Sequence, residues 1–111
     1  MLPSYPARVL EYLDPSGRSP YGEWFDRLNA QAAAKVVVAV TRLTQGNFSN
    51  VKAVGGGVME YKIDFGPGYR VYFGKDGDRL VILLGGGTKH RQQNDIRTAQ
   101  TRWSDYKQRK K

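Results

Sequence analysis

Apolar and polar residues alternate with a period of two between Met59 and Phe73, and this pattern constrains the fold more than any other feature. The glycine-proline-glycine turn at 66–68 interrupts the alternation, which resumes at Tyr69. Successive side chains of a strand point to opposite faces of a sheet. The segment therefore predicts two antiparallel strands joined by a turn, with one face buried. The apolar positions are Met59, Tyr61, Ile63, Phe65, Tyr69, Val71 and Phe73.

The rest of the chain supplies helices and further strands. The pattern predicts a strand at 8–13, helices at 20–29 and 30–45, a strand at 79–84 ended by the three glycines at 85–87, and a last helix from about Asp95. This order predicts an α+β fold with two N-terminal helices packed on a mainly antiparallel sheet of four or five strands, plus a C-terminal helix. No repeat or linker divides the 111 residues, so we expect one domain over 1–111.

Charge and composition narrow the function. Eighteen Lys and Arg residues against ten Asp and Glu residues give a net charge of +8, which favours a polyanionic partner such as nucleic acid. The chain has no cysteine and one histidine, so thiolate and multi-histidine metal sites are excluded. The glycine runs lack the spacing of nucleotide-binding loops. We expect no metal, no small-molecule cofactor and no membrane partner, and a cytoplasmic location, because neither a spanning segment nor a signal sequence is visible.

Turn lengths predict which polar residues share a face. A three-residue turn in the first hairpin pairs Lys62 with Tyr72. A two-residue turn at Asp76-Gly77 then pairs Tyr72 with Val81 and Arg70 with Leu83. The expected result is a solvent-facing patch of two cations and a tyrosine around an apolar floor. Cations bind RNA phosphates and an exposed ring stacks on a base. Ordinary cross-strand pairing is the alternative interpretation of the same residues.

The stretch 56–74 resembles the signature of the addiction-module killer proteins, the HigB-like, phage Gp49-like branch of the RelE/ParE toxin superfamily. The segments 83–89 and 92–96 resemble the strand, loop and helix that follow in that family, and 51–55 resembles its preceding strand. The resemblance covers about residues 8–107.

The resemblance implies a RelE-like, microbial-RNase-like fold and the toxin of a type II toxin–antitoxin module. It implies a HigA-like helix-turn-helix antitoxin as partner and ribosome-bound mRNA as substrate. In the family's commonest activity, a substrate 2′-hydroxyl attacks the adjacent phosphate without a metal, and basic side chains stabilise the developing charge. ParE-like relatives inhibit DNA gyrase instead, so gyrase inhibition and an inactive binding module remain the alternatives.

The resemblance also assigns roles to residues. Arg70, in the Gly-Tyr-Arg motif, is implied to hold the scissile phosphate, and Lys62 lies where the family has a cation on the preceding strand. Lys52 is a looser match one strand earlier. The catalytic candidates are Arg70, Lys62, His90 and Lys89, and the RNA-binding candidates are Lys52, Tyr72 and Arg91.

The proton-transfer residue departs from the family pattern. Several ribonucleases of the family have a tyrosine or histidine near the start of the last helix, where this chain has Gln92-Gln93-Asn94-Asp95. His90 is the candidate substitute, because flanking cations favour its neutral, base-competent form. We further expect an acidic antitoxin segment to cover Val81 and Leu83 beside the cationic site.

Overall fold

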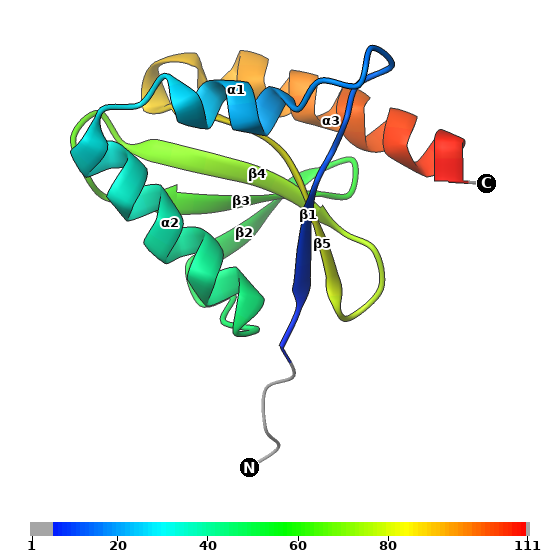
Figure 1. The fold of residues 1–111 in the computed structure, drawn as a ribbon, viewed down its shortest axis with the longest axis horizontal. Helices are drawn as coiled ribbons and strands as arrows, with labels where there is room; N and C mark the ends of the chain where they lie inside the picture. Colours follow the sequence, from blue (N-terminus) through cyan, green and yellow to red (C-terminus); the bar gives the residue numbers. More distant parts are fainter. Residues whose placement is uncertain (1–5, 111) are drawn as a thin grey trace.

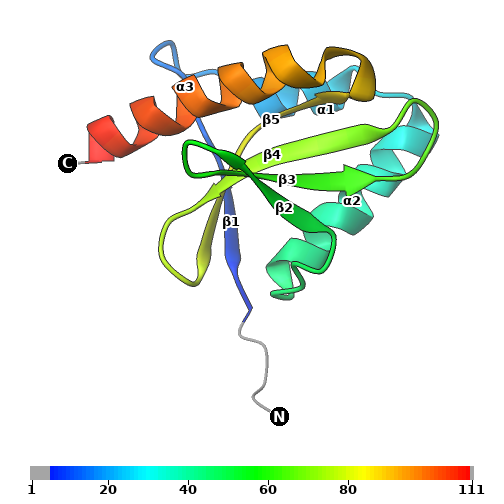
Figure 2. The same ribbon diagram turned by 180° about the vertical axis from the view of Figure 1, so that it is seen from behind.

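The computed structural model describes residues 6–110, which form a five-stranded sheet with helices on both faces (Figures 1 and 2). The strand order is β1-β5-β4-β3-β2; β1 runs parallel to β5 and the other neighbours are antiparallel. The expected α+β class is confirmed, and the architecture is compatible with a RelE-like fold. The elements are β1 (Arg8–Glu11), α1 (Pro20–Asp26), α2 (Ala30–Thr44), β2 (Val51–Gly55), β3 (Val58–Ile63), β4 (Tyr69–Lys75), β5 (Leu80–Thr88), the 3₁₀ turn η1 (Lys89–Arg91) and α3 (Gln92–Lys110).

Side-chain caps fix where α1 and α2 begin. The Gly22 amide donates to the Ser19 hydroxyl, and Pro20 occupies the first turn of α1. The Ala32 amide donates to the Asn29 side chain at the start of α2. Asn29 has extended backbone angles, so it belongs to the cap of α2 rather than to α1. For this reason α1 ends at Asp26, three residues earlier than the sequence predicts.

The first core lies between α2 and the sheet. Val36, Ala39 and Leu43 recur at three- and four-residue spacing on α2 and are buried. They pack against the odd-numbered face of β3 and β4, where Tyr61 and Val71 are buried. The alternation of the central hairpin and the helical period of α2 were therefore predicted correctly.

A second core covers the opposite face of the sheet, which the sequence analysis placed in solvent. Ile96, Ala99 and Trp103 on α3 pack against Tyr72 and Ile82 of the sheet. Figure 2 shows α3 lying across this face, with α2 behind the sheet. The prediction of an open, solvent-facing patch is wrong because α3 is amphipathic enough to bury most of that face.

Strand β5 continues through the three glycines instead of ending before them. The ladder with β4 extends to Thr88, which pairs with Tyr69. A Cβ on Gly86 would overlap the Trp24 ring, and one on Gly85 would lie 2.7 Å from Arg102 Nη1. The glycines allow α1 and α3 to approach the strand closely, and α3 then begins at Gln92 rather than Asp95.

Candidate functional site

The even-numbered residues of β3 and β4 share one face with Lys52 of β2. Lys52 pairs with Glu60, Glu60 with Tyr72, and Lys62 with Arg70. The expected pairing of Lys62 with Tyr72 is off by two residues because the loop spans 64–68. A shift of two residues preserves the face on which each side chain lies. Arg70, Lys62 and Tyr72 thus share a face, as predicted.

Val81 and Leu83 lie on the other face, so the predicted apolar floor beside Arg70 is wrong. Val81 pairs with Lys75 and Leu83 with Phe73, a shift of three residues from the expected register. An odd shift moves every side chain to the opposite face. Both residues are buried in the α1–α2 core and are not available to the antitoxin segment that the sequence analysis expected there.

A buried ion pair joins β3 and β4. Glu60 is fully buried and Arg70 is 5% exposed, with 3.6 Å between Arg70 Nε and Glu60 Oε1. Lys52 Nζ lies 3.7 Å from the same oxygen, and Gln92 Nε2 donates to Glu60 Oε2 at 2.9 Å. Glu60 therefore connects β2, β4 and the start of α3. No role was predicted for Glu60 from the sequence, although the alternation placed it on the same face as Lys62 and Arg70, which was a usable signal.

Tyr72 lies beside this pair and is 1% exposed. Burial, and then the charge of Glu60, raise the pKa of Tyr72, so its phenol stays protonated. Within residues 6–110, neither the Tyr72 hydroxyl nor Glu60 Oε1 nor Arg70 Nε has a partner in hydrogen-bond geometry. The ring has no exposed face on which a base could stack, contrary to its expected position.

The loop at 64–68 brings η1 to Arg70. Arg70 Nη1 donates to the Gly68 carbonyl at 2.8 Å, and the Lys89 amide donates to the same oxygen at 2.9 Å. Lys89, His90 and Arg91 are exposed. Two hydrogen bonds to one carbonyl thus fix η1 beside the buried arginine.

Exposed cations surround the buried pair. The side chains of Lys52 and Lys62 are 64% and 53% exposed, and Lys62 Nζ lies 3.5 Å from an oxygen of the exposed Asp64. Together with η1 they form what we call the cationic rim, made of Lys52, Lys62, Lys89, His90 and Arg91. The structure therefore brings the predicted site residues to one end of the sheet, but with Arg70 and Tyr72 beneath the surface.

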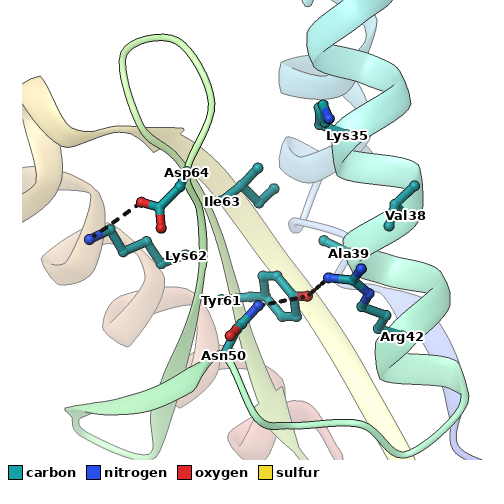
Figure 3. Close-up of a pocket in the computed structure, with 9 residues that line it drawn as sticks. All are labelled: Lys35, Val38, Ala39, Arg42, Asn50, Tyr61, Lys62, Ile63 and Asp64. Carbon is teal, nitrogen blue, oxygen red and sulfur yellow. Dashed lines mark hydrogen bonds and ion pairs between the residues drawn. The ribbon is translucent and has the colours of Figure 1, made fainter.

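A pocket of about 370 Å³ lies on the other side of β3, against α2 (Figure 3). Arg42 Nη1 and Asn50 Nδ2 donate to the Tyr61 hydroxyl at 3.3 and 3.5 Å. Figure 3 shows that the Lys62 side chain turns away from α2 toward Asp64. Lys62 also lines the pocket, so the pocket borders the cationic rim, while its Arg42–Tyr61–Asn50 contacts lie on the α2 side of β3.

Two kinds of site are missing from the described residues: a cluster of metal ligands and a helix able to span a membrane. Within residues 6–110, no group of three or more His, Cys, Asp or Glu side chains could hold a metal ion. Among the helices of the same segment, none combines the length and the apolar character needed to cross a membrane. The described residues offer a cationic surface over a buried carboxylate–guanidinium pair.

The fold and this surface define a small α+β protein whose architecture is compatible with a RelE-like fold and which carries a cationic surface at one end of its sheet. The chain matches the sequence profile of the phage-derived Gp49-like proteins (DUF891) over residues 23–104, and it belongs to that family. An uncharacterized protein of Haemophilus influenzae is 44% identical over 80 residues, which are 71% of this chain and 81% of the relative. The Gp49-like part of the predicted resemblance is confirmed, and family membership points to the toxin of a toxin–antitoxin module.

Proposed function

We propose that the chain is a HigB-like toxin that cleaves mRNA on the ribosome and so blocks translation. The observation that carries the proposal is the cationic rim assembled around the buried Glu60–Arg70 pair. The substrate is a polyanion, and a chain of net charge +8 attracts it. A small helix-turn-helix antitoxin, HigA-like, is the partner that neutralises the toxin.

In the proposed reaction a ribose 2′-oxygen attacks the adjacent phosphorus and the bond from phosphorus to the 5′-oxygen of the next nucleotide breaks. The products are a 2′,3′-cyclic phosphate and a 5′-hydroxyl, and the proton lost by the 2′-hydroxyl is balanced by the one gained by the leaving 5′-oxygen. Lys52 and Lys62 bind the phosphate backbone, and the guanidinium of Arg70 stabilises the charge that develops on the scissile phosphate. Glu60 acts as a positioning residue, because it orients both Lys52 and Arg70. Lys89 and Arg91 add positive charge around the phosphate. His90 accepts the proton of the attacking 2′-hydroxyl and returns a proton to the leaving 5′-oxygen.

Pulse labelling after expression without an antitoxin tests this proposal. We expect early loss of amino-acid incorporation together with fragmented mRNA. Early filamentation with intact translation would instead identify a gyrase inhibitor. Growth without arrest, from a folded and well-expressed chain, would leave only the inactive binding module.

Charge-matched variants test whether the cationic rim is responsible. Lys52→Gln and Lys62→Gln each remove one exposed cation, and a charged hydrogen bond to phosphate is worth about 1.5–3 kcal/mol, or about tenfold or more in rate. Arg18→Gln is the control, since Arg18 is exposed in the loop between β1 and α1 and belongs neither to β2 and β3 nor to η1. Equal cleavage by all three variants would contradict the assigned site.

A further inference from the structure

A second cationic cleft opens at the free edge of β5. Strand β1 pairs with β5 only as far as Leu83, so no strand of the described residues 6–110 pairs with the outer edge of β5 from Gly85 onward. Here α1 and α3 flank the strand on its two faces, and between them lies a cleft of about 260 Å³. Its floor includes the backbone of Gly85 and Gly86 and the buried Tyr72.

Three arginines from three separate elements line this cleft: Arg27 at the end of α1, Arg91 in η1, and Arg102 on α3. The side chains of Arg27 and Arg91 make no hydrogen bond or ion pair with any residue between 6 and 110. Arg102 Nη1 donates to the Leu84 carbonyl at 2.9 Å. Most of the guanidinium hydrogen-bonding capacity in the cleft is therefore unused.

One carboxylate, that of Asp95, lies in the same cleft. No oxygen of Asp95 comes within 4.0 Å of a cationic nitrogen in the described segment. Burial raises the pKa of Asp95, and the charges of Arg91 and Arg102 act against that rise. Burial likewise lowers the pKa of Arg102. The cleft keeps an excess of positive charge, because the exposed Arg27 and Arg91 and the partly buried Arg102 face one carboxylate.

The chemistry of this cleft fits a phosphate ester. Guanidinium groups bind phosphate oxygens through pairs of parallel hydrogen bonds. The Trp24 ring lies against Gly86 and Arg102 Nη1 lies against Gly85, so these two side chains occupy the space that the glycines leave open. The indole of Trp24 forms part of the wall and offers a surface for a base. The side chain of Tyr72, which is 1% exposed, closes the cleft from below.

We propose that this arginine cleft, formed by Arg27, Arg91, Arg102, Trp24, Gly85 and Gly86, binds a nucleotide phosphate next to the cleavage site. Arg91 belongs to both the cationic rim and the arginine cleft, so an RNA strand crossing η1 can place a neighbouring nucleotide there. The choice of RNA as the source of the phosphate rests on the proposed function.

Amide chemical shifts of Gly85 and Gly86 test the proposal with the folded wild-type chain. The probes are uridine, uridine 5′-monophosphate, a 2′-O-methylated trinucleotide that cannot be cleaved, and an oligoglutamate peptide. We expect shifts with both phosphate-bearing probes, tighter binding of the trinucleotide, and none with uridine. A mononucleotide that binds as tightly as the trinucleotide would keep the phosphate site but assign it to a free nucleotide. Shifts with oligoglutamate alone would overturn the proposal and make the β5 edge a docking site for an acidic protein segment.

Variants assign the binding to the arginines. Arg27→Gln removes an exposed guanidinium and is expected to weaken mononucleotide binding about tenfold or more. Arg102→Lys keeps the charge but removes the planar guanidinium that donates pairs of hydrogen bonds, so this variant is also expected to weaken mononucleotide binding. Arg97→Gln is the matched control, because Arg97 is exposed on α3 outside the cleft. Equal binding by the wild type and Arg27→Gln would refute the site.

These binding measurements do not depend on catalysis, so the arginine cleft and the proposed nuclease activity can be refuted independently of each other. Nucleotide binding that Arg27→Gln weakens, in a chain that does not cleave mRNA, would support the arginine cleft and contradict the proposed nuclease. Cleavage of mRNA that Arg27→Gln leaves unchanged, with no amide shifts at Gly85 or Gly86, would contradict the cleft alone.

Discussion

Replacing Arg70 by methionine should destabilise the protein far more than replacing a surface arginine, which costs less than about 0.5 kcal/mol. Arg70 is 5% exposed and faces the fully buried Glu60. Removing one partner of a buried pair typically costs about 3–5 kcal/mol, because the other charge stays buried. Lys52 still contacts Glu60, but its side chain is 64% exposed, so we expect a loss near the lower limit, about 3 kcal/mol.

A double-mutant cycle separates the pair from the rest of the packing. Glu60→Gln/Arg70→Met removes both charges, so its free energy of unfolding should recover to within about 1–2 kcal/mol of the wild type. The coupling energy between the two positions should therefore reach about 1 kcal/mol or more. Urea unfolding measures this coupling energy when it is carried out on the wild type, both single variants and the double variant. A domain of this size has a total free energy of unfolding of about 5–15 kcal/mol, so the expected changes are measurable.

Lys62→Met is the control, because Lys62 and its partner Asp64 are both largely exposed. Its effect on the free energy of unfolding should stay below about 1 kcal/mol. A loss below about 1 kcal/mol for Arg70→Met, or additive effects in the cycle, would refute the reasoning. The same experiment decides how loss of toxicity in Arg70 variants is interpreted, since an unfolded variant reports nothing about phosphate binding.

Two further predictions concern the attachment of α3. Gly74→Ala places a Cβ where the Trp103 ring lies, so we expect a loss of about 1–3 kcal/mol in urea unfolding; wild-type stability would show that the ring can move aside. Hydrogen bonds from Lys110 and Tyr106 lower the pKa of Asp76 below 3.8, so this contact stabilises the fold above that pH and is lost as the pH falls through the folded-state pKa. In an NMR titration, Lys110→Gln should raise the pKa of Asp76; an unchanged value would contradict the assigned cause.

Whether the error in a predicted hairpin register is an even or an odd number of residues explains which parts of the site could be predicted from the sequence. The first turn was misjudged by two residues, and Lys62 and Arg70 still emerged on one face. The second was misjudged by three, and Val81 and Leu83 moved to the opposite face. Alternation specifies the face within a strand, whereas turn geometry decides how neighbouring strands are aligned. Only the alternation within each strand could be recognised directly in the sequence.

Arg70 and Tyr72 are buried because α3 covers their face of the sheet, and no local sequence pattern determines where α3 packs. Ile96, Ala99 and Trp103 form an apolar stripe on α3, but such a stripe does not determine which face of the sheet the helix covers. The sheet had two candidate faces, and α1 and α2 together cover only one (Figures 1 and 2). Two helices on one side and a third on the other is the arrangement that leaves neither apolar face in water.

The Glu60–Arg70 pair is then an unusual component of a small core. Two buried ions contribute less to stability than apolar side chains of similar volume, because desolvation offsets most of their attraction. Here the same carboxylate also holds Lys52 and the Gln92 amide, while Arg70 and Lys89 share the Gly68 carbonyl. Departures from ordinary core packing tend to occur where function requires them. The pair organises three segments of the cationic rim into one fixed surface, which stability alone would not require.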